Sequence, residues 1–136
     1  MLTHLECTRC DRRYQPDRGS TLCECGSPLF ARYDLARAAL EMRPGHLALR
    51  EPTLWRYREV LPLEDQDERV TLGEGFTPLV PAPRLGERLG LPKLLLKEEG
   101  VNPTGSFEAR GMALAVTMAR RFGVTDLCLP SAGNAG

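Results

Sequence analysis

The sequence lacks an excess of charge of either sign, because 18 Lys and Arg residues balance 18 Asp and Glu residues in a chain of 136. A dedicated binder of nucleic acid or acidic membranes needs a surplus or a cluster of basic side chains, so this balance argues against both partners. No apolar run approaches the roughly 20 residues that span a bilayer, and residues 1–10 lack the basic-then-apolar order of a signal peptide. We therefore expect a cytoplasmic protein.

Cysteine is unevenly distributed, since four of the five cysteines fall between residues 7 and 25. They form two close pairs, Cys7 with Cys10 and Cys23 with Cys25. Two thiol pairs separated by a short loop are typical of a zinc ribbon, in which each turn offers two thiolates to a tetrahedral site. The second pair has one intervening residue instead of two, which weakens the match. Four sulfur ligands leave no open coordination position, so the expected zinc is structural.

Two disulfides are the alternative explanation of these pairs. A chain without a secretory signal faces a reducing cytosol, where disulfides rarely persist, so zinc is favoured. Around the cysteines, four arginines and three acidic residues lie between residues 9 and 24. This mixture gives no one-sided basic patch, so a nucleic-acid role for the ribbon is not expected.

The rest of the chain predicts a helical connector followed by an α/β region. Asp34 is placed to cap a short helix that Pro44 would stop, and residues 54–62 predict a second helical turn in which Trp55 packs inside. From Val70 onward, strand and helix patterns alternate, which is the signature of an α/β domain. We therefore divide the chain into a zinc ribbon at 1–34, a helical connector at 35–69 and a partial α/β domain at 70–136.

Within the α/β region, residues 93–97 and 127–130 predict strands, and residues 105–122 predict the longest helix. The helix should bury one apolar face, formed by Phe107, Gly111, Leu114, Met118 and Phe122. Loops at 98–111 and 131–136 follow the two predicted strands, where ligands bind in open α/β sheets. Their small and hydroxyl residues suit an anion, although a simple turn and a helix cap explain each loop equally well.

Together with the ribbon, these loops resemble the threonine synthase family, which belongs to the fold type II (tryptophan synthase β-like) pyridoxal-phosphate enzymes. The resemblance extends over nearly the whole length. Its motifs are Cys23–Gly26, Arg32–Asp34, Leu54–Arg58 with Leu61 and Pro62, Leu72–Leu79, Asn102–Phe107, Ala109–Gly111 and Ser131–Asn134. It implies the first strand–helix units of the cofactor domain of a lyase that converts O-phospho-L-homoserine and water to L-threonine and phosphate.

In this family a lysine holds pyridoxal 5'-phosphate as a Schiff base and shuttles protons. The resemblance puts that catalytic lysine at position 108, where this chain has Glu108. A carboxylate cannot form an imine, and its charge opposes the anionic cofactor. Lys93 and Lys97 belong to the preceding strand and cannot replace the missing amine. We therefore expect this chain to be inactive as written.

Other family positions are present. Asn134 matches the residue that contacts the cofactor ring, and Ser131 belongs to the loop that receives the substrate's carboxylate or phosphate. Asn102 and Ser106 shape the entrance of the helix, where capping explains them equally well. Because the sequence stops after an apolar run, before any glycine-rich loop for the cofactor phosphate, we expect a truncated chain.

The small amino-acid substrate and the oligomeric state stay open, and a homo-oligomer is compatible with the family. The alternative is a non-catalytic zinc-ribbon module that contacts a partner protein.

Overall fold

The computed structural model describes residues 1–16, 19 and 21–136. Asp17 and Arg18, which were counted among the charges around the cysteines, lie outside the described residues. The chain divides into two compact units. The first contains residues 1–51, 55–68 and 118–124, and the second contains residues 52–54, 69–117 and 125–136. In the part of the chain that the structure describes, no helix has the length and apolar character needed to cross a membrane.

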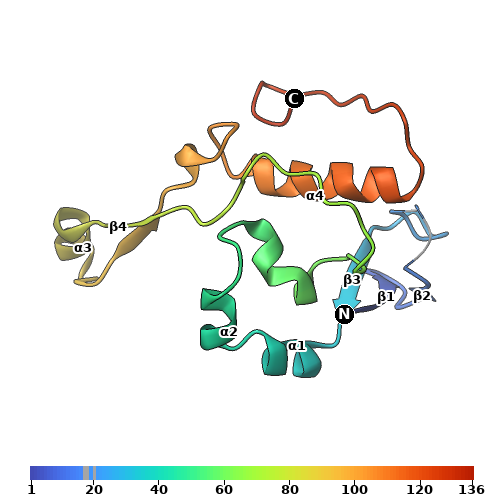
Figure 1. Cartoon of the computed structure of the whole chain (residues 1–136), viewed down its shortest axis with the longest axis horizontal. Coiled ribbons are helices and arrows are strands. Elements are labelled where there is room, and N and C mark those ends of the chain that lie inside the picture. The colour runs from blue at the N-terminus through green and yellow to red at the C-terminus, as the bar shows by residue number, and fades with distance from the viewer. Residues whose placement is uncertain (17–18, 20) are drawn as a thin grey trace. The chain divides into compact units, whose positions relative to one another are not determined.

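The first unit begins with a three-stranded antiparallel sheet of β1 (Leu2–Cys7), β2 (Arg13–Tyr14) and β3 (Leu29–Tyr33) in the order β2-β1-β3 (Figure 1). The central strand β1 ends at Cys7, so the turn toward β2 begins at this cysteine. An isolated bridge between Leu22 and Pro28 closes a second turn, in which Gly26 has a φ of 80°. This left-handed conformation favours glycine. The sheet and the bridge thus produce two tight turns, each of which carries one cysteine pair.

Short helices follow the sheet. They are α1 (Leu35–Glu41), α2 (Pro44–Ala48) and the 3₁₀ segment η1 (Leu54–Val60). The side chain of Asp34 accepts a hydrogen bond of 2.9 Å from the backbone N of Arg37, which confirms the predicted helix cap. Pro44 both follows the first helix and occupies the first turn of the second, where its missing N–H costs nothing.

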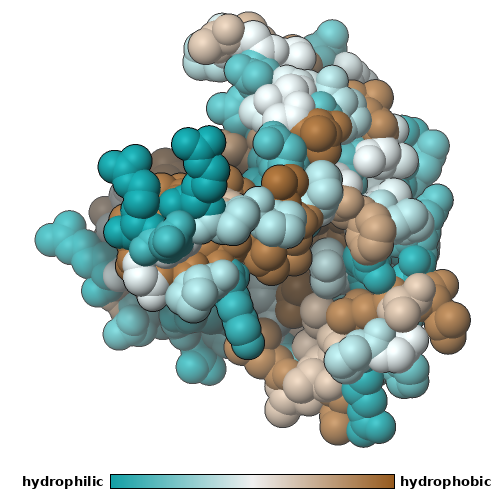
Figure 2. Space-filling view, turned by 90° about the vertical axis from the view of Figure 1, so that its left-hand side faces the viewer, coloured by the Kyte–Doolittle hydropathy of each residue, from teal (hydrophilic) through white to brown (hydrophobic). Residues whose placement is uncertain are grey.

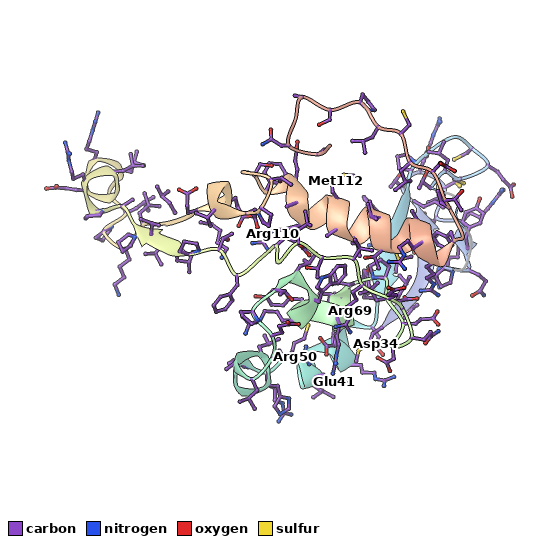
Figure 3. The ribbon with its side chains drawn as sticks, turned by 45° about the horizontal axis from the view of Figure 1, so that its top comes forward. Asp34, Glu41, Arg50, Arg69, Arg110 and Met112 are labelled. Carbon is purple, nitrogen blue, oxygen red and sulfur yellow. The ribbon has the colours of Figure 1, made fainter. Side chains whose placement is uncertain are left out.

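The interior of the first unit combines apolar and charged side chains. Trp55 is buried, as predicted, and Glu59 is only 2% exposed. Arg50 binds both carboxylate oxygens of Glu59, at 2.6 and 2.7 Å (Arg50 is labelled in Figure 3). This arginine holds the pKa of Glu59 below its ordinary value. A buried carboxylate is tolerated when it is paired in this way.

The second unit contains β4 (Leu79–Pro81), α3 (Pro83–Leu89), β5 (Leu95–Lys97), the 3₁₀ turn η2 (Glu99–Val101) and most of α4 (Glu108–Arg121). Strands β4 and β5 pair antiparallel across α3. The strand predicted at 93–97 is confirmed in its second half. The strand predicted at 127–130 is wrong, because these residues pair with no described strand and the ladder that defines a strand does not form.

Burial in the second unit differs from the expected pattern. The predicted apolar face of α4 is only partly buried. Phe107, just before the helix, is 67% exposed, Leu114 and Met118 are half-buried, and the fully buried residues of the helix are Ala109 and Thr117. Figure 2 views the side that carries α3 and β4, where apolar surface lies beside hydrophilic surface. Leu79 of β4 and Leu85 of α3 are among the exposed apolar residues. The other buried residues of this unit are Gly86 and three polar ones, Glu74, Thr77 and Asn102. Polar contacts therefore hold its loops.

Candidate functional site

The four clustered cysteines of the first unit form a candidate metal centre. Their sulfur atoms all lie within 4.8 Å of one another, and the Cys7–Cys25 and Cys10–Cys23 sulfur pairs are each 3.6 Å apart. Four sulfurs at the usual zinc distance of ~2.3 Å in a tetrahedron are separated by about 3.8 Å. A disulfide would bring two sulfurs to about 2.0 Å, so neither of these two pairs is a disulfide. The cluster is close enough to bind a metal ion.

The local turns determine how each sulfur is held. Backbone N–H groups of Arg9 and Cys10 both donate to Cys7 Sγ at 3.4 Å. Hydrogen bonds from the Ser27 side chain and backbone lower the pKa of Cys25 to about 6. The backbone of Arg12 acts to lower the pKa of Cys10, yet the hydrogen bonds of this thiol with Cys7 and Cys23 raise it to about 11. Without a bound cation, the Cys25 thiol therefore ionises before the Cys10 thiol.

Tyr14 is a neighbour of the cluster that the sequence motifs did not single out. Its hydroxyl lies 3.1 Å from Cys23 Sγ and accepts a hydrogen bond of 3.2 Å from the backbone N of Glu24. Tyr14 lies on β2, shortly after the first cysteine turn, and pairs with Leu5 of β1. Its position soon after Cys10 is the sequence signal that could have drawn attention to it.

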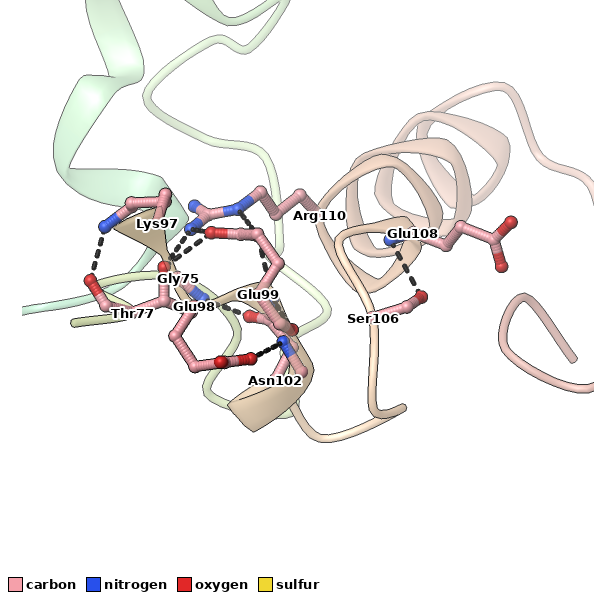
Figure 4. Close-up of polar contacts among 10 residues, drawn as sticks. Gly75, Thr77, Lys97, Glu98, Glu99, Asn102, Ser106, Glu108 and Arg110 are labelled. Carbon is pink, nitrogen blue, oxygen red and sulfur yellow. Dashed lines mark hydrogen bonds and ion pairs between the residues drawn. The ribbon is translucent and has the colours of Figure 1, made fainter. Parts of the chain in front are cut away.

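In the second unit, Glu99 is the centre of a polar network that joins two loops (Figure 4). Arg110 donates to both of its carboxylate oxygens, and the Thr77 hydroxyl donates to one of them. Asn102 Nδ2 donates to the other at 2.9 Å, while Asn102 Oδ1 accepts from the backbone N of Gly75 at 3.1 Å. The pKa of Glu99 is lowered to about 2, and the hydrogen bonds from Arg110 are the largest cause.

Glycine is required at position 75 of this network. Gly75 has a φ of 106°, and a Cβ added there would lie 2.6 Å from the backbone N of Leu54. The loop therefore needs glycine both for its backbone conformation and for this close approach. Asn102 and Arg110 consequently act as structural residues here, and Arg110 is an ion-pair partner of Glu99 rather than a solvated helix charge.

Glu108, the position that resemblance assigns to the catalytic lysine, begins α4 and lies outside this network. Its carboxylate is exposed and points away from the cluster of Glu99 and Arg110 (Figure 4). Ser106 Oγ accepts a hydrogen bond of 3.2 Å from the backbone N of Glu108, so Ser106 does cap the helix entrance. Among the described residues, no cationic side chain lies within ion-pair distance of Glu108. A carboxylate in the first helical turn is favourable for the helix dipole.

The loop predicted to bind cofactor and substrate lies against the loop before α4. Asn134 Nδ2 donates to the carbonyl of Thr104 at 3.0 Å, which brings the two loops together. Ser131 Oγ accepts from the backbone N of Gly133, Ala135 and Gly136 at 2.9 to 3.2 Å. The free N–H groups that were expected to attract an anion are thus directed at a side chain of their own loop.

A pocket of about 330 Å³ lies beside these loops, within the second unit. Its walls are mainly apolar and include Met112, which Figure 3 labels, together with Val116 and Leu129. Thr104 contributes a buried hydroxyl that has no hydrogen-bond partner among the described residues. Glu108 does not line this pocket.

Residues 70–136 match the family model described as pyridoxal-phosphate dependent enzyme. The chain is 41% identical over 128 residues to the threonine synthase of Methanocaldococcus jannaschii, covering 94% of this chain and 32% of that protein. It is 39% identical over 132 residues to the threonine synthase of Methanosarcina acetivorans, covering 96% and 32%. The Mycobacterium leprae threonine synthase is 51% identical over 78 residues, covering 57% and 21%. No solved structure matches significantly.

The α/β segment from residue 70 to 136 is therefore similar to the pyridoxal-phosphate dependent enzymes. Within this class, the resemblance of the chain to threonine synthase is confirmed. The chain spans about a third of the length of these two curated relatives, 32% in each case.

The residues around position 108 do not fit the cofactor of this class. An imine needs an amine, and the exposed carboxylate of Glu108 supplies none. An anionic phosphate and a lone carboxylate also repel each other.

Proposed function

We propose that the chain is a segment of a threonine synthase-like protein and that it does not catalyse the reaction as written. The reaction of this family is the conversion of O-phospho-L-homoserine and water to L-threonine and phosphate with pyridoxal phosphate. The observation that carries the proposal is the exposed carboxylate of Glu108 at the start of α4, at the position where the motif requires a lysine. The matched relatives support the family, and Glu108 supports inactivity.

The surrounding structure supports an intact frame around a substituted position. Arg110, two residues after Glu108, holds Glu99 by two hydrogen bonds, of 2.7 and 2.8 Å. This pair fixes the start of α4 independently of the residue at 108. Substitution of Glu108 therefore changes the chemistry of the position rather than the fold around it.

In this proposal, Asn134 contacts the cofactor ring and Ser131 receives the substrate's carboxylate or phosphate. The hydrogen bond between Asn134 and the carbonyl of Thr104 supports a place for both beside the loop before α4. Ser131 has first to release the backbone N–H groups that its hydroxyl accepts, because these groups are the donors that an anion needs.

We also propose that the cysteine cluster binds one structural zinc ion through Cys7, Cys10, Cys23 and Cys25, as a zinc ribbon at residues 1–34. The sulfur spacing of 3.6 Å supports it. The helical connector at 35–69 and the α/β domain at 70–136 complete the proposed division. A cytoplasmic location, a small amino-acid substrate, and no nucleic-acid or membrane partner belong to the same proposal.

A chimaera tests the role of Glu108 directly. Residues 70–136 would replace the matching segment of the Methanocaldococcus jannaschii threonine synthase, with Glu108 retained or changed by Glu108→Lys. We expect no threonine formation from O-phosphohomoserine with Glu108 and measurable formation with Glu108→Lys. Glu108→Gln is the matched control, because it removes the negative charge without supplying an amine and should stay inactive.

Turnover by the Glu108 chimaera would show that Glu108 does not prevent catalysis and would overturn the proposed inactivity. Inactivity of a folded Glu108→Lys chimaera would show that this loop is not the cofactor-attachment site.

A further inference from the structure

The two cysteine turns differ in how their backbones hold the first sulfur of each pair. In the first turn, the N–H three residues after Cys7, that of Cys10, donates to Cys7 Sγ at 3.4 Å. In the second turn, the N–H three residues after Cys23, that of Gly26, donates at 2.8 Å to the carbonyl oxygen of Cys23 and not to its sulfur. In the shorter second turn, the backbone N–H three residues after the first cysteine thus binds an oxygen, whereas in the first turn the corresponding N–H binds sulfur.

The hydroxyl of Tyr14 lies 3.1 Å from Cys23 Sγ, which also receives a backbone hydrogen bond from Cys25. A metal-bound cysteine is a thiolate without a proton, so in the metal-bound state the proton of this contact comes from the tyrosine. The backbone N–H of Glu24 donates to the same oxygen at 3.2 Å and so helps to hold it in place. The cross-strand pairing of Tyr14 with Leu5 fixes the strand from which the hydroxyl reaches the sulfur.

We propose that Tyr14 is a positioning residue of the metal centre, whose hydroxyl is the second donor to Cys23, in the role that the backbone N–H of Cys10 has for Cys7 in the first turn. This inference rests on the zinc site proposed above. A hydrogen bond to a metal thiolate orients the ligand and reduces its tendency to protonate and leave the metal. Loss of such an outer partner typically weakens metal affinity about 10- to 100-fold.

The test is the zinc affinity of the full chain, measured by competition with a chromophoric chelator. Tyr14→Phe keeps the ring and removes only the hydroxyl. Tyr33→Phe is the matched control, because it removes a hydroxyl from β3 of the same sheet without a contact to the cysteines. We expect one zinc per chain in all three proteins at saturation, with affinity reduced about 10-fold or more in Tyr14→Phe alone.

A second measurement separates action through Cys23 from a general loss of stability. In a Cys23→Ser background, Tyr14→Phe should change zinc affinity less than about twofold, because the thiolate that the hydroxyl serves is absent. In a Cys10→Ser background, it should keep its full effect. A merely structural role would weaken zinc binding equally in both backgrounds.

The outcomes distinguish the two proposals. If the wild-type chain binds no zinc, the metal centre and the role of Tyr14 are both overturned. If the wild type binds zinc and Tyr14→Phe matches Tyr33→Phe in affinity, only the role of Tyr14 is overturned. A Tyr14→Phe chain that stays unfolded in saturating zinc also contradicts it, because a positioning hydroxyl is not needed for folding.

Discussion

Arg110 and Glu99 form a two-point ion pair, with Arg110 Nε 2.7 Å from Oε2 and Nη2 2.8 Å from Oε1 of the carboxylate. The pair joins the first turn of α4 to η2. The two side chains are only 24% and 22% exposed, so water and salt screen the pair less than a surface ion pair. It therefore anchors the start of α4 to the loop that precedes it.

This ion pair predicts acid sensitivity. The pKa of Glu99 is lowered from its ordinary value of 4.5 to about 2, first by the hydrogen bonds from Arg110. The stability that Glu99 contributes is therefore complete above about pH 4.5 and is lost as the pH falls toward about 2. Urea unfolding across this pH range should show the loss of stability. In Glu99→Gln this pH dependence should be absent. Glu87→Gln, on α3, is the control and should leave it unchanged.

The buried hydroxyl of Thr117 predicts a specific cost for an isosteric change. Thr117 Oγ1 accepts the backbone N–H of Val70 at 3.0 Å, and the side chain is 1% exposed. Thr117→Val leaves this N–H without its acceptor, so the free energy of unfolding should fall by about 1–3 kcal/mol. Thr117→Ser keeps the hydroxyl, so its loss should be smaller. Equal losses of unfolding free energy in the two variants would mean that the hydrogen bond from Val70 does not account for the destabilisation.

Removal of metal should affect the sheet of the first unit. If zinc links the two cysteine turns, a strong chelator should release one zinc per chain and disorder β1, β2 and β3, because binding energy is folding energy in small metal sites. Amide hydrogen exchange of β1 before and after chelation measures this effect. Cys128→Ser is the control and should keep full zinc content, since Cys128 lies in the second unit. A sheet that stays protected without metal would argue against a structural zinc.

Local sequence signals predicted much of this architecture. The Asp34 cap, the buried Trp55 and the long helix α4 depend on short-range chemistry that neighbouring residues determine, and all three are present. The close approach of the four cysteines was predictable for the same reason, because their spacing places them on two turns.

Contacts between distant segments were less predictable. Residues 127–130 have the apolar composition of a strand but no described pairing partner, and composition alone does not supply one. The apolar face assigned to α4 is only partly buried, and polar partners from other segments, such as the Val70 N–H at Thr117, contribute to what the helix buries. Tyr14 was missed because its contact with Cys23 depends on strand pairing rather than on a motif.

Covalent capture of the cofactor tests the central claim, that Glu108 prevents cofactor attachment, most directly. The chimaera described above would be incubated with pyridoxal phosphate, reduced with borohydride, digested and mapped by mass spectrometry. The segment contains only two lysines, Lys93 and Lys97, so an adduct at residue 108 is readily assigned. We predict no adduct in the peptide containing Glu108 and a stoichiometric adduct on residue 108 after Glu108→Lys. Stoichiometric capture on Lys93 or Lys97 in the chimaera with Glu108 would contradict the claim.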